Sequence, residues 1–93
     1  MSTTFEYQTI AIPARMLVML NEGTISATEV AIYGIIFRDG IHSYRTNDEI
    51  AQITGKHDKH VARCIRNMRR RGLIGRKTTP VGRRLRIIEL PED

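Results

Sequence analysis

The chain has 93 residues, 41% hydrophobic and 27% charged, which is typical of one small folded domain and excludes an intrinsically disordered segment. Its net charge of +5 is unevenly distributed: residues 56–86 contain twelve basic residues and one acidic residue, whereas the rest contain three basic and nine acidic residues. The longest apolar stretch, residues 30–37, is too short to span a bilayer, and the single Cys64 excludes an internal disulfide and fits a reducing cytoplasm.

The N-terminal quarter is expected to hold an extended lead-in and a first helix. Residues 1–12 are predicted to be extended, because residues 5–12 alternate partly and are biased toward β-branched side chains. Pro13 suits the first position of a helix, which residues 21–23 end. The predicted apolar side of this helix consists of Met16, Leu17, Met19 and Leu20.

A capping-box pattern marks the second helix, with Ser26 as N-cap and Glu29 three residues later. Residues 27–37 are apolar nearly all round, so we expect this helix to be buried at the centre of the domain. Asp39 and Gly40 end it, and residues 42–44 form a short connection or a minimal strand.

Residues 46–71 are predicted to form two helices joined by a tight turn. Thr46 and Glu49 form a second capping box, and Gly55 breaks the short helix that follows. The inward-facing residues predicted for that helix are Ile50, Ala51 and Ile53. The next helix runs from about Asp58 to Arg71 and ends at Gly72.

The spacing in this region is that of a helix-turn-helix unit. Ala51 is small enough for two helices to cross closely, Gly55 takes the turn four residues later, and Val61 lies ten residues after Ala51. One position departs from the usual pattern, because Lys56 follows the turn glycine where an apolar residue is common.

Projection of the last helix at 100° per residue separates two faces. Val61, Cys64, Ile65 and Met68 fall on one side, which we expect to face the core. Lys59, Arg63, Arg66 and Arg70 fall on the opposite side. Like charges at this spacing repel, and an ordinary solvated face would mix acids with bases, so the pattern favours a surface that meets phosphates and base edges.

The N-terminal turn of that helix is expected to reach deepest into a DNA groove. Asp58 there either opposes the helix dipole or accepts a hydrogen bond from a cytosine amino group. The predicted DNA-binding residues of this helix and its preceding turn are Lys56, His57, Lys59, His60, Arg63, Arg66, Asn67 and Arg70.

Residues 73–90 are predicted to form a β-hairpin. Its strands are expected at residues 73–74 and 85–90, around turn chemistry at residues 79–82. The hairpin carries a second set of predicted DNA-binding residues: Arg76, Lys77, Arg83, Arg84 and Arg86. The alternative is that these charges only protect a strand edge from aggregation, but five cations without an acid exceed that need.

Residues 44–90 resemble a winged helix-turn-helix domain. TNDEIAQITG matches the first motif helix and turn, HDKHVARCIRNMRRRGLIG the recognition helix, and GRKTTPVGRRLRIIEL the wing. The segment IPARML…ISATEVAIYGIIF is similar to leading helices in phage and plasmid proteins, including N-terminal domains of replication initiators. The resemblance implies one domain over residues 1–93, mainly α with a C-terminal β-hairpin, that binds double-stranded DNA and often forms homodimers.

We expect no enzyme activity, metal or cofactor. His57, His60 and Cys64 have a spacing that invites a zinc site, but Cys64 is predicted to face the core and nothing nearby completes a tetrahedral set. His42 is expected to cap or hydrogen-bond locally. No P-loop motif is present, and most carboxylates fall at predicted helix starts, where capping explains them.

These observations predict a cytoplasmic, nucleoid-associated protein that binds double-stranded DNA sequence-specifically. Its predicted role is a small transcriptional regulator of a phage, plasmid or other mobile element, with the acidic N-terminal half free for a second subunit or a protein partner. One alternative is a DNA-architecture adaptor in plasmid segregation, replication-origin binding or excision that coats repeated sites. Alternatives of another class are RNA binding, since a basic helix and hairpin can grip A-form RNA, and binding of acidic proteins.

Overall fold

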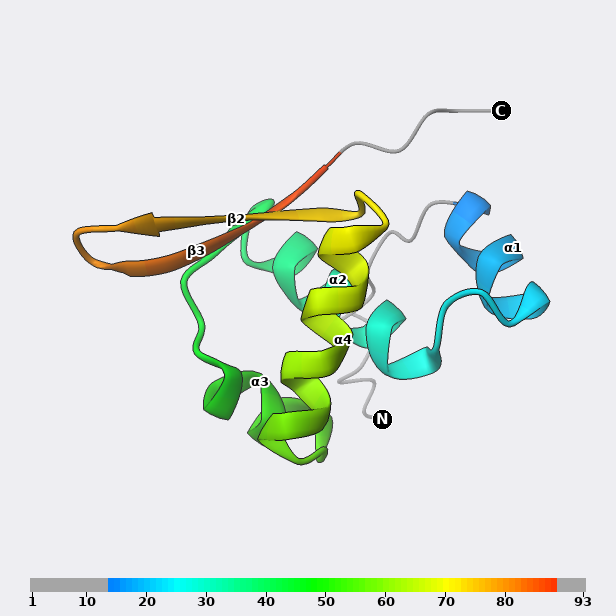
Figure 1. Ribbon diagram of the computed structural model, residues 1–93, viewed down its shortest axis with the longest axis horizontal. Helices are drawn as coiled ribbons and strands as arrows, with labels where there is room; N and C mark the ends of the chain where they lie inside the picture. The colour runs from blue at the N-terminus through cyan, green and yellow to red at the C-terminus, as the bar shows by residue number, and fades with distance from the viewer. Residues whose placement is uncertain (1–13, 89–93) are drawn as a thin grey trace, which may run out of the picture.

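The computed structural model describes residues 14–88, which form four helices and an antiparallel sheet of three strands, an α+β arrangement (Figure 1). The elements are α1 (Ala14–Glu22), α2 (Ala27–Arg38), β1 (His42–Ser43), α3 (Asn47–Thr54), α4 (Asp58–Arg70), β2 (Ile74–Thr79) and β3 (Gly82–Ile87). The predicted lead-in at residues 1–12, Pro13 and the end of the predicted hairpin at residues 89–90 lie outside the described residues.

Both predicted capping boxes are confirmed. The Ser26 amide donates to the Glu29 carboxylate at 2.7 Å, and the Glu29 amide donates to the Ser26 hydroxyl at 3.2 Å. At the start of α3, the Thr46 amide donates to the Glu49 carboxylate at 2.8 Å and the Glu49 amide donates to the Thr46 hydroxyl at 3.2 Å. Each box satisfies two of the backbone donors that a helix start leaves unpaired.

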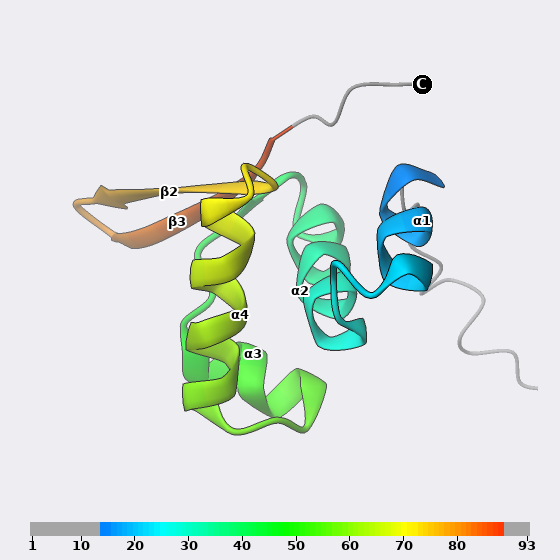
Figure 2. The ribbon, with the colours of Figure 1, turned by 45° about the vertical axis from the view of Figure 1, so that its right-hand side comes forward.

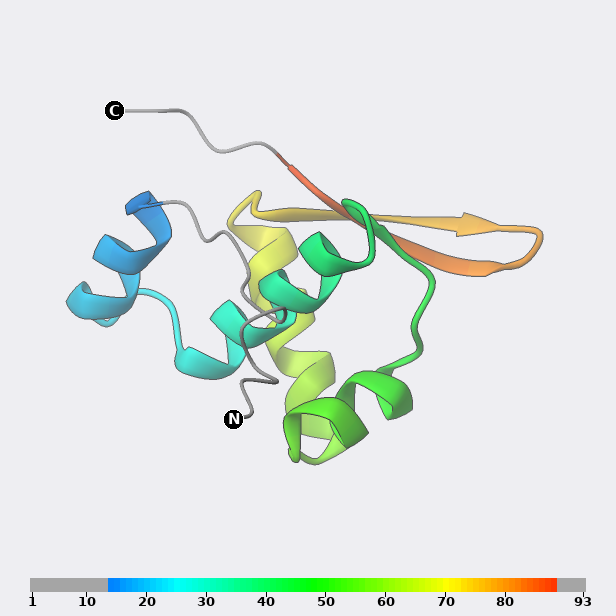
Figure 3. The same cartoon turned by 180° about the vertical axis from the view of Figure 1, so that it is seen from behind.

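Helix α2 lies at the centre of the helical layer, as its apolar sequence predicts. It lies between α1 and α4 in the view of Figure 2. Figure 3, which shows the molecule from the side opposite to Figure 1, has α2 nearer to the viewer than α4. Its buried residues are Glu29, Ile32, Tyr33, Gly34, Ile35 and Ile36. Burial raises the pKa of Tyr33 above its ordinary value. Helix α2 packs against one side of α4, and the opposite side of α4 stays exposed.

The predicted apolar side of α1 is only partly confirmed. Met16 is buried and Met19 packs against the core, but Leu17 is 52% exposed and Leu20 is 36% exposed. Helix α1 packs at the periphery, so its contact with the rest of the described chain is narrow and does not reach the flanks of its apolar side (Figure 2).

The prediction that Ile53 faces inward is wrong, because its side chain is 49% exposed. Ile50 is buried, and Ala51 and Thr54 are half-buried, so the buried face of α3 is centred between these three positions. At 100° per residue, Ile53 lies about 100° from that centre. The break after α3 is confirmed: Gly55 has φ 72° and its amide donates to the Ala51 carbonyl at 2.8 Å.

The sheet has the strand order β1-β3-β2, and the hairpin is longer at its tip than the sequence predicts. Pairing in β2–β3 continues from Ile74–Ile87 to Thr79–Gly82, leaving Pro80 and Val81 as the turn, and β3 ends at Ile87. Beyond the core the hairpin extends past the helices (Figure 1). Its side chains there are polar on both faces, so the apolar alternation that marks a half-buried strand is missing from the sequence.

A polar network fixes the connection from α2 through β1 to α3. Arg45 donates to the Asp39 carboxylate at 2.8 and 3.1 Å, and the Ser43 hydroxyl donates to it at 2.7 Å. Burial opposes ionisation of Asp39, but these hydrogen bonds and the charges of Arg45 and Arg38 outweigh it, so the pKa of Asp39 is lowered.

This network predicts acid sensitivity. Because the pKa of Asp39 is lower in the folded state, its stabilisation is present above the unfolded value near 4 and is lost as the pH falls through the folded value. At pH 7, Asp39→Asn should lower the free energy of unfolding by about 1 kcal/mol, a low value for charged hydrogen bonds because Arg45 is partly in solvent. Thermal unfolding should show this difference at pH 7 and a smaller one at pH 2–3. A difference that persists unchanged in acid would contradict the ionic role.

Ile41 has an unusual backbone conformation between α2 and β1, with φ 78°. Its amide donates to the Ile36 carbonyl at 3.1 Å, and its carbonyl accepts from the Ile87 amide at 3.0 Å. These two hydrogen bonds fix the chain between the end of α2 and the point where it begins to pair with β3, the central strand.

Candidate nucleic-acid interface

The four cations that the helical projection groups on α4 are all exposed in the structure. We call Lys59, Arg63, Arg66 and Arg70 the α4 basic stripe. Within the described residues, none of them forms an ion pair with an acidic side chain. The only acid in α4 is Asp58, in its first turn. The stripe is therefore a row of positive charges that no carboxylate of the described fold neutralises.

The opposite side of α4 is buried, as predicted, and consists of Val61, Cys64, Ile65 and Met68. This side packs against α2, α3 and β2. Because the core fixes the rotation of the helix about its axis, it also fixes the direction in which the stripe points.

The start of α4 is capped by His57, whose Nδ1 accepts a hydrogen bond from the Lys59 amide at 3.1 Å. The same nitrogen lies 2.9 Å from the Asp58 carboxylate. These two interactions exclude each other, because Nδ1 needs a free lone pair to accept and a proton to donate. Both His57 and Lys56 are exposed, so this turn is open to a ligand.

His60 and Asn67, which the sequence places among the DNA-binding residues, are only half-exposed. His60 Nε2 lies 3.8 Å from Cys64 Sγ, and burial raises the pKa of the Cys64 thiol. Among residues 14–88, no group of three or more His, Cys, Asp or Glu side chains is placed to hold a metal ion.

The five hairpin cations lie on two faces of the sheet. Arg84 and Arg86 alternate with buried Leu85 and Ile87, so they lie on the face away from the helices. Lys77 pairs with Arg84 and shares that face, whereas Arg76 pairs with Leu85 and Thr78 pairs with Arg83 on the helix side. The alternation of arginine with Leu85 and Ile87 could have predicted this division from the sequence.

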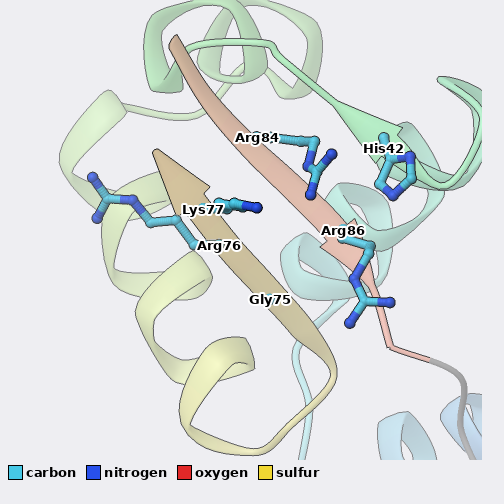
Figure 4. Close-up of a pocket in the computed structure, with 6 residues that line it drawn as sticks. All are labelled: His42, Gly75, Arg76, Lys77, Arg84 and Arg86. Atoms are coloured by element: carbon cyan, nitrogen blue, oxygen red, sulfur yellow. The ribbon is translucent and has the colours of Figure 1, made fainter. Parts of the chain in front are cut away.

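Arg76 extends the basic surface of α4. It lines a hollow beside the C-terminal half of the helix together with Arg66, Arg69 and Arg70. In Figure 4 the Arg76 side chain extends to the left, away from Lys77, Arg84 and Arg86. Arg69 was not among the predicted site residues, although it is exposed and lies next to Arg70 in the sequence.

Arg83 is engaged within the protein. Its Nη1 donates to Asn47 Oδ1 at 2.6 Å, and its Nη2 donates to the Arg45 carbonyl at 2.7 Å. Burial, followed by the charge of Arg76, lowers the pKa of Arg83. The guanidinium thus joins the hairpin to the start of α3, and we call these interactions the Arg83 brace. No local sequence signal predicts it, since Asn47 is 36 residues away.

The brace predicts energetic coupling between two positions. Arg83→Ala and Asn47→Ala should each lower the free energy of unfolding by about 1–2 kcal/mol, and the double variant should lose clearly less than the sum, because both remove the same bond. Each 1 kcal/mol corresponds to about 4–8 °C in melting temperature for a domain of this size. Thermal unfolding of the four proteins completes the cycle. Strict additivity would show that Arg83 and Asn47 do not interact.

The exposed face of the sheet also includes His42, which is not among the predicted DNA-binding residues. His42, expected to bond locally, is exposed in β1 and is paired in register with Arg86. A two-residue strand has no recognisable period, so the sequence could not place His42 beside the hairpin.

No protein-family model matches the chain, and no curated protein sequence matches it significantly. Within residues 14–88, every helix is too short or too polar to cross a lipid bilayer.

Proposed function

We propose that this protein is a winged helix that binds double-stranded DNA sequence-specifically. In this proposal α3 and α4 are the helix-turn-helix unit, α4 is the recognition helix, and the β2–β3 hairpin is the wing. A protein of this kind would act in the cytoplasm on the nucleoid.

The observation that carries the proposal is the α4 basic stripe. Four exposed cations follow one side of a 13-residue helix whose other side is core, and they lack acidic partners within the described fold. Their mutual repulsion disfavours the isolated helix, and phosphates would relieve it while releasing condensed counterions.

The dimensions of α4 suit a DNA groove. Lys59 and Arg70, the ends of the stripe, are eleven residues apart in the sequence, about 16.5 Å at the rise of an α-helix. A helix with its side chains is about 10–12 Å across, and the major groove of B-DNA is about 12 Å wide. Arg63 and Arg66 lie mid-stripe, where arginine can donate two hydrogen bonds to guanine, and Arg76 adds a cation beside the C-terminal half.

We propose transcriptional regulation of a phage, plasmid or other mobile element as the role of this binding. The protein would act as a homodimer, with α1 as a contact surface, because Leu17 and Val18 there are each 52% exposed. Sedimentation of the purified protein tests the dimer. A footprint that covers one short palindrome near a promoter would support the regulator, and protection of an array of direct repeats would contradict it.

The test of DNA binding is selection of a preferred site from random duplexes, followed by competition at several salt concentrations. Duplex DNA of the selected sequence should compete better than duplex RNA, single-stranded RNA or duplex DNA of scrambled sequence. The logarithm of affinity should fall linearly with the logarithm of salt concentration, by about 0.9 for each phosphate contacted. Equal competition by RNA would overturn the proposal in favour of RNA binding, and equal competition by scrambled DNA would overturn sequence specificity.

A further inference from the structure

The exposed face of the sheet gathers four basic side chains from three strands. His42 comes from β1, Lys77 from β2, and Arg84 and Arg86 from β3, and we call them the outer sheet cluster (Figure 4). His42 is paired with Arg86 and Lys77 with Arg84 in the strand register. Directly opposed residues share one face of a sheet, and like charges in that position destabilise the pairing.

Gly75 opens a hollow within this cluster. It is paired with Arg86 on the same face and contributes no side chain. The open hollow has a volume of about 450 Å³ and is lined by His42, Gly75, Arg76, Lys77, Arg84 and Arg86, with no acidic residue among them. Arg84 Nε is buried there without a hydrogen-bond partner in the described residues. The hollow thus presents donors and positive charge but no acceptor with a negative charge.

The cluster lies on the other side of the sheet from the α4 basic stripe. In β3, Leu85 and Ile87 are buried against the helices. Arg84 and Arg86 alternate with them and therefore point away from the helices. In Figure 4 the cluster faces the viewer, whereas Arg76 extends from β2 toward α4, which is seen beside the edge of the sheet. Gly75 and Arg76 line both this hollow and the one beside α4, so the two basic surfaces meet at the edge strand β2. A duplex in contact with α4 would have to bend around that edge to reach the cluster. Bending 20–30 base pairs by 40–90° costs roughly 1–6 kcal/mol, which favours a separate segment.

We propose that the outer sheet cluster is a second phosphate-binding site that holds the backbone of another DNA duplex, so that one molecule bridges two duplexes. This inference rests on the proposed function, because the first duplex is the one held by α4. Bridging would bring together distant sites on one DNA molecule or two DNA molecules.

The test uses substitutions of Gly75. Gly75 does not have a positive φ, and a Cβ there would meet only Ile88 Cδ1 at 3.8 Å, an ordinary contact. Gly75→Glu therefore adds a carboxylate to the cluster at a position that accepts a Cβ without a clash or backbone strain. Gly75→Gln is the matched control, since it has the same size and no charge. A second variant, Arg84→Gln with Arg86→Gln, removes two charges from the cluster.

The experiment measures two quantities for the full-length protein: its affinity for an immobilised duplex with the selected site, and the amount of a second, labelled duplex that it captures there. We expect Gly75→Glu to lower capture at least about tenfold, with less than about threefold change in affinity for the first duplex. The double arginine variant should lower capture by a similar factor. Gly75→Gln should change capture little.

The possible failures are distinguishable. A wild-type protein that binds the first duplex but captures no second one overturns bridging and leaves the proposed function standing. Equal losses of affinity and capture in Gly75→Glu mean that the cluster contacts the first duplex, and this also overturns the inference. Capture that is insensitive to both Gly75→Glu and the double arginine variant also overturns the inference, because another surface then holds the second duplex. A wild-type protein that binds no duplex overturns the proposed function as well.

Discussion

A protein in which Arg63 and Arg66 are both replaced by alanine should lose about 30-fold or more in affinity for its DNA site. Both side chains are exposed in the middle of the α4 basic stripe, and each good arginine contact with a base contributes about 1–3 kcal/mol of discrimination. If either residue contacts a phosphate instead, the salt dependence should fall by about 0.9 for that contact, with no loss of sequence preference. Fluorescence anisotropy with selected and scrambled duplexes at several salt concentrations separates the two contributions.

The control for this experiment removes a cation elsewhere. Arg38→Ala eliminates an exposed charge at the end of α2, outside both the α4 basic stripe and the outer sheet cluster. It should weaken binding far less than Arg63→Ala alone. Circular dichroism should show that all variants remain folded. Unchanged affinity in a folded double variant would remove the basis of the proposed function, because the stripe would then not contact DNA.

Replacing Val61 with aspartate should unfold the domain. Val61 has 0% exposure and lies on the core side of α4. An unpaired carboxylate in such a site costs several kcal/mol, which is comparable to the whole stability of 5–15 kcal/mol typical of a small domain. Circular dichroism at 25 °C should show loss of most helical signal.

Val61→Ala provides the matched comparison, since it removes volume without adding charge. It should lower the free energy of unfolding by about 2 kcal/mol and leave a folded protein that still binds DNA. A Val61→Asp protein that keeps native helicity and melts cooperatively would show that this position is not buried. The direction assigned to the α4 basic stripe would then also be wrong.

The sequence was most informative where local chemistry decides structure. The capping pairs Ser26–Glu29 and Thr46–Glu49 need only residues three apart, and both helices begin as predicted. The core side of α4 follows from helical period alone, and all four predicted residues are buried. The turn at Gly55 required a positive φ, which glycine supplies at little cost.

Prediction was poorest where distant parts of the chain meet. The Arg83 brace joins residues from α3 and β3, and β1 is too short to show a strand pattern. Ile53 was misplaced because apolar character alone does not locate the centre of a buried face on an eight-residue helix. The length of the hairpin could not be predicted from the sequence, because its exposed tip lacks an apolar pattern.

The position of Ile41 has a consequence for how this sequence can evolve. A β-branched residue with φ 78° is strained by about 1–2 kcal/mol, and its side chain is 49% exposed, so burial recovers little of that energy. Glycine or asparagine would adopt the same backbone with less strain. The protein is therefore less stable than it could be. A substitution of Ile41 by glycine or asparagine could offset a destabilising change acquired elsewhere, including one that alters DNA recognition.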